Sequence, residues 1–176
     1  MPNPVTSPPA RLLASQLERF LAYHGWAYNR LLAGLEALDE DSYRAQCGLF
    51  FGSVHGTLNH LAVADRIWLA RVRHEPPPFT RLDVEAVSER SALAGFLADG
   101  VHAWRVLLSA QDDRSLGLPL AYRNMRGEPL LKPLADIVLH LVNHGTHHRG
   151  QISAALTALG QPTPQLDYLY FLPEPL

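Results

Sequence analysis

The sequence is poor in the residue types that mark several large classes of protein. It contains one cysteine, Cys47, which excludes an intrachain disulfide and a thiolate metal cluster. It contains one lysine, Lys132, and its arginines stand singly along the chain. Because no basic stripe is present that would neutralise phosphates, we expect no nucleic-acid partner.

Long hydrophobic runs are also missing. The apolar stretches are interrupted within about ten residues, whereas a membrane-spanning helix needs about 20. Residues 1–10 are proline-rich and have no apolar run, so we expect neither a signal peptide nor a membrane span there. These absences predict a cytoplasmic protein that does not bind membranes.

The remaining bulk features fit one globular domain. With 176 residues, we expect a single domain over residues 1–176, of which residues 1–8 form a flexible tail. Charged residues make up only 18% of the chain and the formal net charge is −2. So little charge on a chain rich in apolar residues favours a homodimer, in which a second subunit covers an apolar face.

Hydrophobic periodicity predicts four long helices, over residues 9–38, 53–74, 88–111 and 133–159. Acidic residues 39–41 are expected to form a solvated break after the first helix. We expect caps at the helix ends from Ser53 for the second helix, Ser88 or Ser91 for the third, and Gly160 for the fourth. Pro133 is expected at the first position of the fourth helix.

The segment between the third and fourth helices has a different period. Leu118, Leu120 and Tyr122 alternate, and residues 124–127 have turn chemistry, which predicts either a small β-hairpin or an ordered Ω-like loop. The aromatic tail, residues 166–176, must pack on the rest of the chain. The fold class predicted is therefore all-α, a four-helix bundle, which can hold metal sites on facing helices.

Four of the nine histidines lie close together on the fourth predicted helix. On a helical wheel with His140 at 0°, the apolar residues occupy about 60–160°, with His148 near 80° and His144 near 40°. His140 and His147 point further round, outside this arc. Because two buried neutral imidazoles four residues apart would each need a partner, a shared metal ion is favoured over two separately hydrogen-bonded rings.

The second predicted helix supplies a third candidate ligand. His60 lies within the apolar arc of this helix, whereas His55 lies near 220° from it, on the predicted solvent side. His24, His74 and His102 have no partner pattern and are not expected to be ligands. Asp65 lies inside the same apolar arc and is either a partner that orients a metal-bound histidine or a purely structural group, with the structural role favoured.

Several runs of sequence resemble the DinB family, the damage-inducible, YfiT-like group of four-helix proteins. The most specific run is NHGTHHRGQI at residues 143–152, and GSVHGTLNHLAVADRIWL at residues 52–69 is similar to the family as well. Two weaker runs near the ends of the chain, YHGWAYN at residues 23–29 and DYLYFLP at residues 167–173, complete a resemblance that spans nearly the whole chain.

The resemblance implies a metal ion bound by one histidine of the second helix and by two, four residues apart, on the fourth. Those positions fall on His60, His144 and His148, which the helical wheels also select. It also implies a homodimer and a relationship to metal-dependent thiol transferases and isomerases that act with low-molecular-weight thiols.

Three imidazoles without a carboxylate leave a position open for water or substrate, which is typical of a catalytic site. Such ligands suit Zn, Ni, Co or Fe(II), and the sequence does not distinguish these metals. The leading hypothesis is a divalent-metal-dependent enzyme that binds a small-molecule thiol as thiolate and presents it to an electrophile. The alternatives are a metal-dependent hydrolase and a metal-binding, stress-response protein without turnover. A closed site, with His140 or His147 as a fourth ligand, would favour the last.

Overall fold

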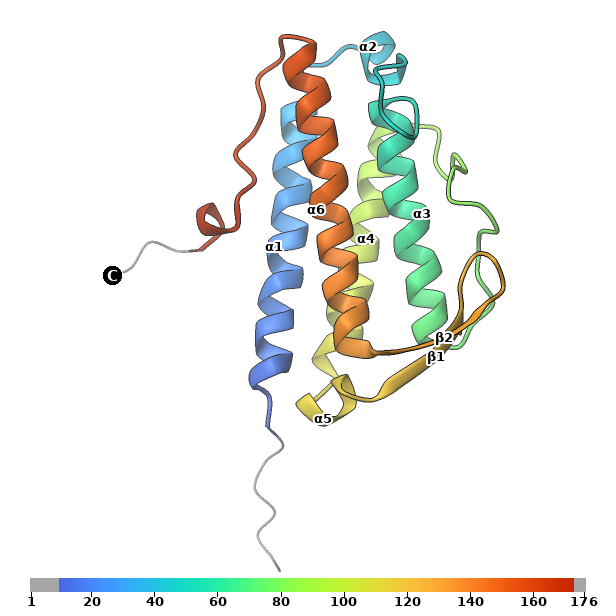
Figure 1. The fold of residues 1–176 in the computed structure, drawn as a ribbon. Helices are drawn as coiled ribbons and strands as arrows, with labels where there is room; N and C mark the ends of the chain where they lie inside the picture. Colours follow the sequence, from blue (N-terminus) through green and yellow to red (C-terminus); the bar gives the residue numbers. More distant parts are fainter. Residues whose placement is uncertain (1–9, 173–176) are drawn as a thin grey trace, which may run out of the picture.

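The structure, a computed structural model, describes residues 10–172. Its four long helices are α1 (Leu12–Leu35), α3 (Val54–Val72), α4 (Arg90–Ser109) and α6 (Leu134–Ala158). Helix α1 packs against α4 and α6, and α3 packs against the same two helices (Figure 1). The predicted all-α four-helix bundle is therefore confirmed.

Side chains and backbone turns define the helix ends. The hydroxyl of Ser53 accepts a hydrogen bond from Gly56 N, so the predicted cap of α3 is confirmed. Helix α4 is capped instead by Glu89, whose carboxylate accepts hydrogen bonds from the backbone N–H groups of Ser91 and Ala92. The prediction of Ser88 or Ser91 was wrong, because a carboxylate next to the positive end of a helix is a stronger acceptor than a hydroxyl.

Two other ends need smaller corrections. Residues 39–41 are not simply a break, since Asp39 caps a short helix, α2 (Glu40–Arg44). Pro133 stands one residue before α6, with extended backbone angles (φ −55°, ψ 144°), so it is the N-cap and not the first helical residue. Gly160 follows α6 with a φ of +68°, a conformation that favours glycine, as predicted.

The connections between the helices differ greatly in length. Residues 73–89 run back along the bundle, so that α3 and α4 point in the same direction (Figure 1). After a short helix, α5 (Asp113–Leu116), strands β1 (Pro119–Arg123) and β2 (Pro129–Pro133) pair antiparallel. Of the two structures predicted here, the hairpin is the correct one.

The tail packs on the first helix of the bundle. The hydroxyl of Tyr23 on α1 donates a hydrogen bond to the carbonyl of Leu166 (2.9 Å). A short 3-10 helix, η1 (Tyr168–Tyr170), brings Tyr168 and Phe171 against Tyr23 and Trp26. The aromatic tail therefore covers one face of α1, as far as residue 172; the predicted flexible tail, residues 1–8, lies outside the described residues.

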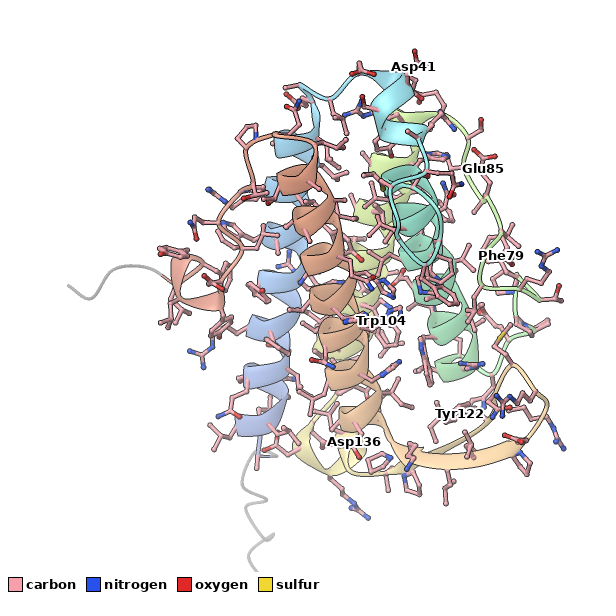
Figure 2. The ribbon with its side chains drawn as sticks, turned by 45° about the horizontal axis from the view of Figure 1, so that its top comes forward. Asp41, Phe79, Glu85, Trp104, Tyr122 and Asp136 are labelled. Atoms are coloured by element: carbon pink, nitrogen blue, oxygen red, sulfur yellow. The ribbon has the colours of Figure 1, made fainter. Side chains whose placement is uncertain are left out.

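The apolar core is divided into two clusters along the bundle. The cluster near the hairpin includes Trp104 and Val138, and the cluster at the other end includes Leu58 and Ile152. Trp104 is labelled within the bundle in Figure 2. The polar layer between the clusters holds four buried ionisable side chains, His24, His60, His148 and Arg149, and the largely buried Asp65. Among residues 10–172, no helix is both long and apolar enough to cross a membrane.

Candidate metal centre

Three imidazole rings converge in the polar layer between α3 and α6. His144 Nε2 lies 3.1 Å from His60 Nε2 and 3.1 Å from His148 Nε2. One ring nitrogen from each residue lies within 4.8 Å of the other two. Over residues 10–172, this is the only group of three or more histidine, cysteine or acidic side chains with such spacing. The three residues that the sequence selects as ligands thus lie together.

The helical geometry explains this convergence. His144 and His148 are one turn apart on α6, so both side chains leave the helix in nearly the same direction. Helix α6 packs against α3, and His60 projects from α3 into the same space. His60 and His148 are buried, whereas His144 is partly accessible to solvent.

Two of the rings are oriented by hydrogen bonds on the side away from the cluster. His60 Nδ1 lies 3.0 Å from the carbonyl oxygen of Leu82, and His148 Nδ1 lies 2.7 Å from Gln151 Oε1. Because both oxygens are acceptors, each Nδ1 carries the proton and donates it. The unprotonated Nε2 of each ring therefore faces the cluster with its lone pair, as in metal-binding histidines.

An aromatic side chain supports the cluster from the segment before α3. The ring of Phe51 stacks on His60, with 3.7 Å between ring centroids and an interplanar angle of 13°. The same ring meets His148 edge-on at 5.7 Å. Phe51 therefore holds two of the three imidazoles in place and shields them from water.

The environment keeps these rings neutral. Burial lowers the pKa of His60 to about 4, although the Leu82 carbonyl opposes this shift. Burial, with repulsion from His148 and His60, lowers the pKa of His144 to about 3, and burial also lowers the pKa of His148. All three side chains are therefore uncharged imidazoles at neutral pH, the form in which a histidine can bind a metal.

The donor set fits a divalent ion. Without a cation, an Nε2–H of His144 can donate to only one of the two unprotonated Nε2 atoms, whereas a shared cation satisfies all three nitrogens. Tetrahedral Zn–N bonds of about 2.0–2.1 Å place the ligand nitrogens about 3.3 Å apart, close to the spacing seen here. Imidazole nitrogens also bind Ni, Co and Fe(II), so the residues fit the metals expected from the sequence.

The neighbouring histidines lie outside the cluster. His140 and His147 are exposed, and their rings lie 5.7 Å from His144 and 5.0 Å from His148, measured between centroids. Neither contributes a nitrogen to the group of three. This agrees with their position outside the apolar arc of α6.

The predicted exposure of His55 was wrong. This side chain is buried, because residues 73–89 fold over the face of α3 that the wheel assigns to solvent. Its Nε2 lies 2.7 Å from Glu85 Oε1, and its ring packs against Tyr43. His55 thus anchors the long connection and lies outside the three-histidine group.

The contacts of Asp65 indicate a structural role, which was the favoured of the two predictions. Its carboxylate lies 3.2 Å from Arg66 Nη1, and burial raises its pKa to about 7. The side chain lies against α4 where Gly100 lacks a Cβ; a Cβ there would be 2.1 Å from Asp65 Oδ2. Asp65 therefore helps to join α3 to α4. Within residues 10–172, it makes no hydrogen bond to His60, His144 or His148.

The sequence reasoning missed a second buried pair in the polar layer. Arg149 Nη1 donates a hydrogen bond to His24 Nδ1 (3.0 Å), and Nη2 donates to Thr146 Oγ1 (3.0 Å). Gly145 makes room for the pair, since a Cβ there would be 2.3 Å from His24 Cε1. On the helical wheel of α6, with His140 at 0°, Arg149 lies near 180°, beside the apolar arc. This position could have identified Arg149 as a residue that faces the bundle.

Comparisons with known proteins agree with this architecture. A family model described as the DinB family matches residues 1–174. Protein DinB of Bacillus subtilis (strain 168) is 25% identical over 164 residues, which cover 85% of this chain and 90% of that protein. The crystal structure of a DinB-like protein from Bacillus cereus ATCC 10987 aligns with a TM-score of 0.61 at 20% identity, over 83% of this chain and 94% of that one. At this identity the structural likeness supports the fold alone.

Proposed function

This chain belongs to the DinB family, and we propose that it is a divalent-metal-dependent enzyme that activates a low-molecular-weight thiol. His60, His144 and His148 would hold the ion. The observation that carries this proposal is the convergence of three Nε2 atoms, two of them with their proton held on Nδ1 by Leu82 and Gln151. When bound, a divalent ion lowers the pKa of a thiol and so supplies a nucleophile at neutral pH.

The residues around the cluster support a thiol more than a water molecule as the group that is activated. Within residues 10–172, the cluster contains no carboxylate that could remove a proton from water. A thiol, with a pKa near 8.5, needs less help than water to lose its proton. In the proposed transfer the thiol proton passes to solvent, sulfur forms a bond to an electrophilic carbon, and the leaving group departs with its electron pair.

The site geometry supports access by a small substrate. His144 is partly exposed, while Phe51 and the 73–89 connection enclose the sides formed by His60 and His148. Three protein ligands leave at least one position for an exogenous group. His140 and His147 are exposed beside this opening, and the ring of His140 stacks on that of His144.

A spectroscopic titration tests the proposal. Protein purified without a histidine tag is loaded with cobalt, and small thiols are added while the visible spectrum is recorded. We expect the spectrum to change without loss of cobalt, and we expect loss of free thiol when an alkyl halide is supplied as the electrophile. A spectrum that no thiol changes would overturn thiol activation, and a spectrum that changes without turnover would favour a binding protein.

We also propose that the protein is a cytoplasmic homodimer. Exposed apolar side chains on the hairpin and the adjacent part of α6 support a second subunit: Leu118, Leu130, Leu131 and Leu139. Light scattering at micromolar concentration should give twice the chain mass, and a monomer mass would overturn this part of the proposal.

A further inference from the structure

The cavity beside the hairpin contains an arginine that the metal centre does not use. The cavity has a volume of about 540 Å³ and lies between the hairpin and the connection after α3. Phe79 and Tyr122, labelled in Figure 2, border it from these two segments. Arg71, from the last turn of α3, also lines it.

Arg71 differs from the other partly or fully buried arginines. Arg149 donates to His24 and Thr146, Arg66 bonds Asp65 and the carbonyl of Phe96, and Arg90 bonds two carbonyls at the end of α1. In contrast, no carboxylate within residues 10–172 lies within 4 Å of the Arg71 guanidinium. A half-buried cation without a counter-ion is a group to which an anion can bind.

Two aromatic rings hold the Arg71 guanidinium in position. Its central carbon lies 4.6 Å from the centroid of Trp68 and 5.2 Å from that of Tyr122. Rings that stack on a guanidinium cover its faces and leave the N–H groups at its edge free to donate. The fork of N–H groups matches the two oxygens of a carboxylate.

The same rings connect Arg71 to the histidine cluster. Trp68 meets His140 at 5.4 Å between centroids, and His140 stacks on His144 at 5.7 Å. His60 and Arg71 are eleven residues apart on α3, which places them within about 20° on the helical wheel and about 16 Å apart along the axis. The guanidinium of Arg71 packs on Trp68, which is three residues nearer to His60 along α3, in agreement with the lean of helical side chains toward the N-terminus.

We propose that Arg71 binds a carboxylate of the small molecule whose thiol is activated at His60, His144 and His148. The substrate class is then an anionic thiol, with its sulfur at the histidine cluster and its carboxylate at Arg71. This inference rests on the proposed function and adds a specificity residue to it. Arg123 and Glu75 also line the cavity. Its charged lining is therefore two arginines and one glutamate, a balance that favours an anion.

The test uses pairs of probes that differ only in charge. Cobalt-loaded protein is titrated with ω-mercaptocarboxylates of increasing length and with the corresponding amides, and the dissociation constants are read from the visible spectrum. At the best length, the acid should bind about tenfold more tightly than the amide, since a charge-assisted hydrogen bond distinguishes them. Equal binding of acid and amide at every length would overturn the proposal.

Arg71 and Arg73 lie at the same end of α3, so variants of Arg71 provide the test and a variant of Arg73 provides the control. In Arg71→Gln the acid should bind no better than the amide, whereas binding of the amide stays unchanged. Arg71→Lys should keep part of the preference, because an ammonium keeps the charge and loses the fork. Arg73→Gln removes the same charge from an exposed position that does not line this cavity, and it should keep the whole preference. A preference that survives in Arg71→Gln would exclude Arg71 as its source.

A second pair of probes separates the two proposals. Imidazole-4-propionate and its amide bind cobalt through nitrogen in place of sulfur. If no thiol changes the spectrum and the imidazole acid is still preferred through Arg71, thiol activation fails and the anion site stands. Cobalt uptake and circular dichroism of Arg71→Gln show whether the variant is folded, and failure of the wild-type protein to take up cobalt would overturn both proposals.

Discussion

The polar layer of the bundle contains two groups of buried histidines that look alike by accessibility and differ in what faces their ring nitrogens. His60 is 4% exposed and His24 is 3% exposed. His24 Nδ1 accepts a hydrogen bond from the guanidinium of Arg149, whereas His60 Nε2 faces His144 Nε2 at 3.1 Å. Burial alone therefore does not distinguish a candidate metal ligand from a structural histidine; what faces the free ring nitrogen does.

The two groups also handle charge differently. The cation of Arg149 is stabilised in the core because His24 and Thr146 accept its hydrogen bonds and because it lies over the rings of Tyr23 and Tyr28. The three-histidine cluster contains no cation of its own, and burial keeps its rings neutral. The His24–Arg149 pair is hydrogen-bonded within the protein, whereas the ring nitrogens of the three-histidine cluster are close enough together to share a cation.

The strongest test of this difference is to remove one ligand. His60→Ala, His144→Ala and His148→Ala should each lose essentially all bound metal, because two imidazoles do not hold the ion against competing water. Metal content is measured by elemental analysis after gel filtration. His55→Ala and His74→Ala are the controls and should keep the metal; loss of metal from His55→Ala with retention in His60→Ala would reverse the assignment of the two histidines.

Acid should empty the cluster. Protons compete with the metal for the imidazole nitrogens, so metal release below neutral pH should take up more than one proton per ion. The pKa values of about 4 for His60 and about 3 for His144 lie below the unfolded value of about 6.5. The unfolded chain therefore binds protons first, so the stability of the metal-free protein is complete above pH 6.5 and is lost as the pH falls toward these folded values.

Metal release and helical circular dichroism should be measured together between pH 7 and about 4. We expect the helices to persist after the metal has left, because apolar packing supplies most of the folding free energy. In the metal-free protein, His144→Ala should make the free energy of unfolding less dependent on pH. Helix loss that follows metal loss at every pH would show that the ion is structural.

Removing the histidine of the His24–Arg149 pair should affect stability and leave metal binding intact. His24→Ala leaves a buried guanidinium without one acceptor, which should lower the free energy of unfolding by about 2–4 kcal/mol. Urea denaturation measures this change. His102→Ala, an exposed histidine on α4, is the matched control and should change stability by less than about 0.5 kcal/mol. An empty metal site in His24→Ala would mean that the two groups do not act separately.

The smallest effect on metal binding is expected for a residue that orients a metal-binding histidine and does not itself contact the metal. Gln151→Leu removes the acceptor of His148 Nδ1 and should weaken metal binding about 10- to 100-fold, without abolishing it. Competition with a chelator gives the dissociation constant. Gln161→Leu, beyond the end of α6, serves as the control. Unchanged affinity in Gln151→Leu would show that packing against Phe51 alone orients His148.

Much of the fold could be predicted from local patterns. The apolar periods predicted the four long helices, and alternation followed by turn residues predicted either a hairpin or an ordered loop where β1 and β2 lie. The errors concerned helix ends and caps, such as Glu89 in place of a serine, and the two short helices α2 and α5, which periodicity did not predict. Cap choice depends on which side chain happens to reach the free N–H groups, and periodicity carries no information about that.

The sequence by itself determined the direction of each histidine relative to its own helix, because a helix turns by a fixed angle per residue. This is why His144 and His148 point together, and why His60 faces inward. Only the tertiary structure decided what surrounds them. The 73–89 connection buries His55 and brings the Leu82 carbonyl to His60, and the packing of α1 on α6 joins His24 to Arg149. These contacts depend on irregular backbone and on segments far apart in the chain, so no local period encodes them.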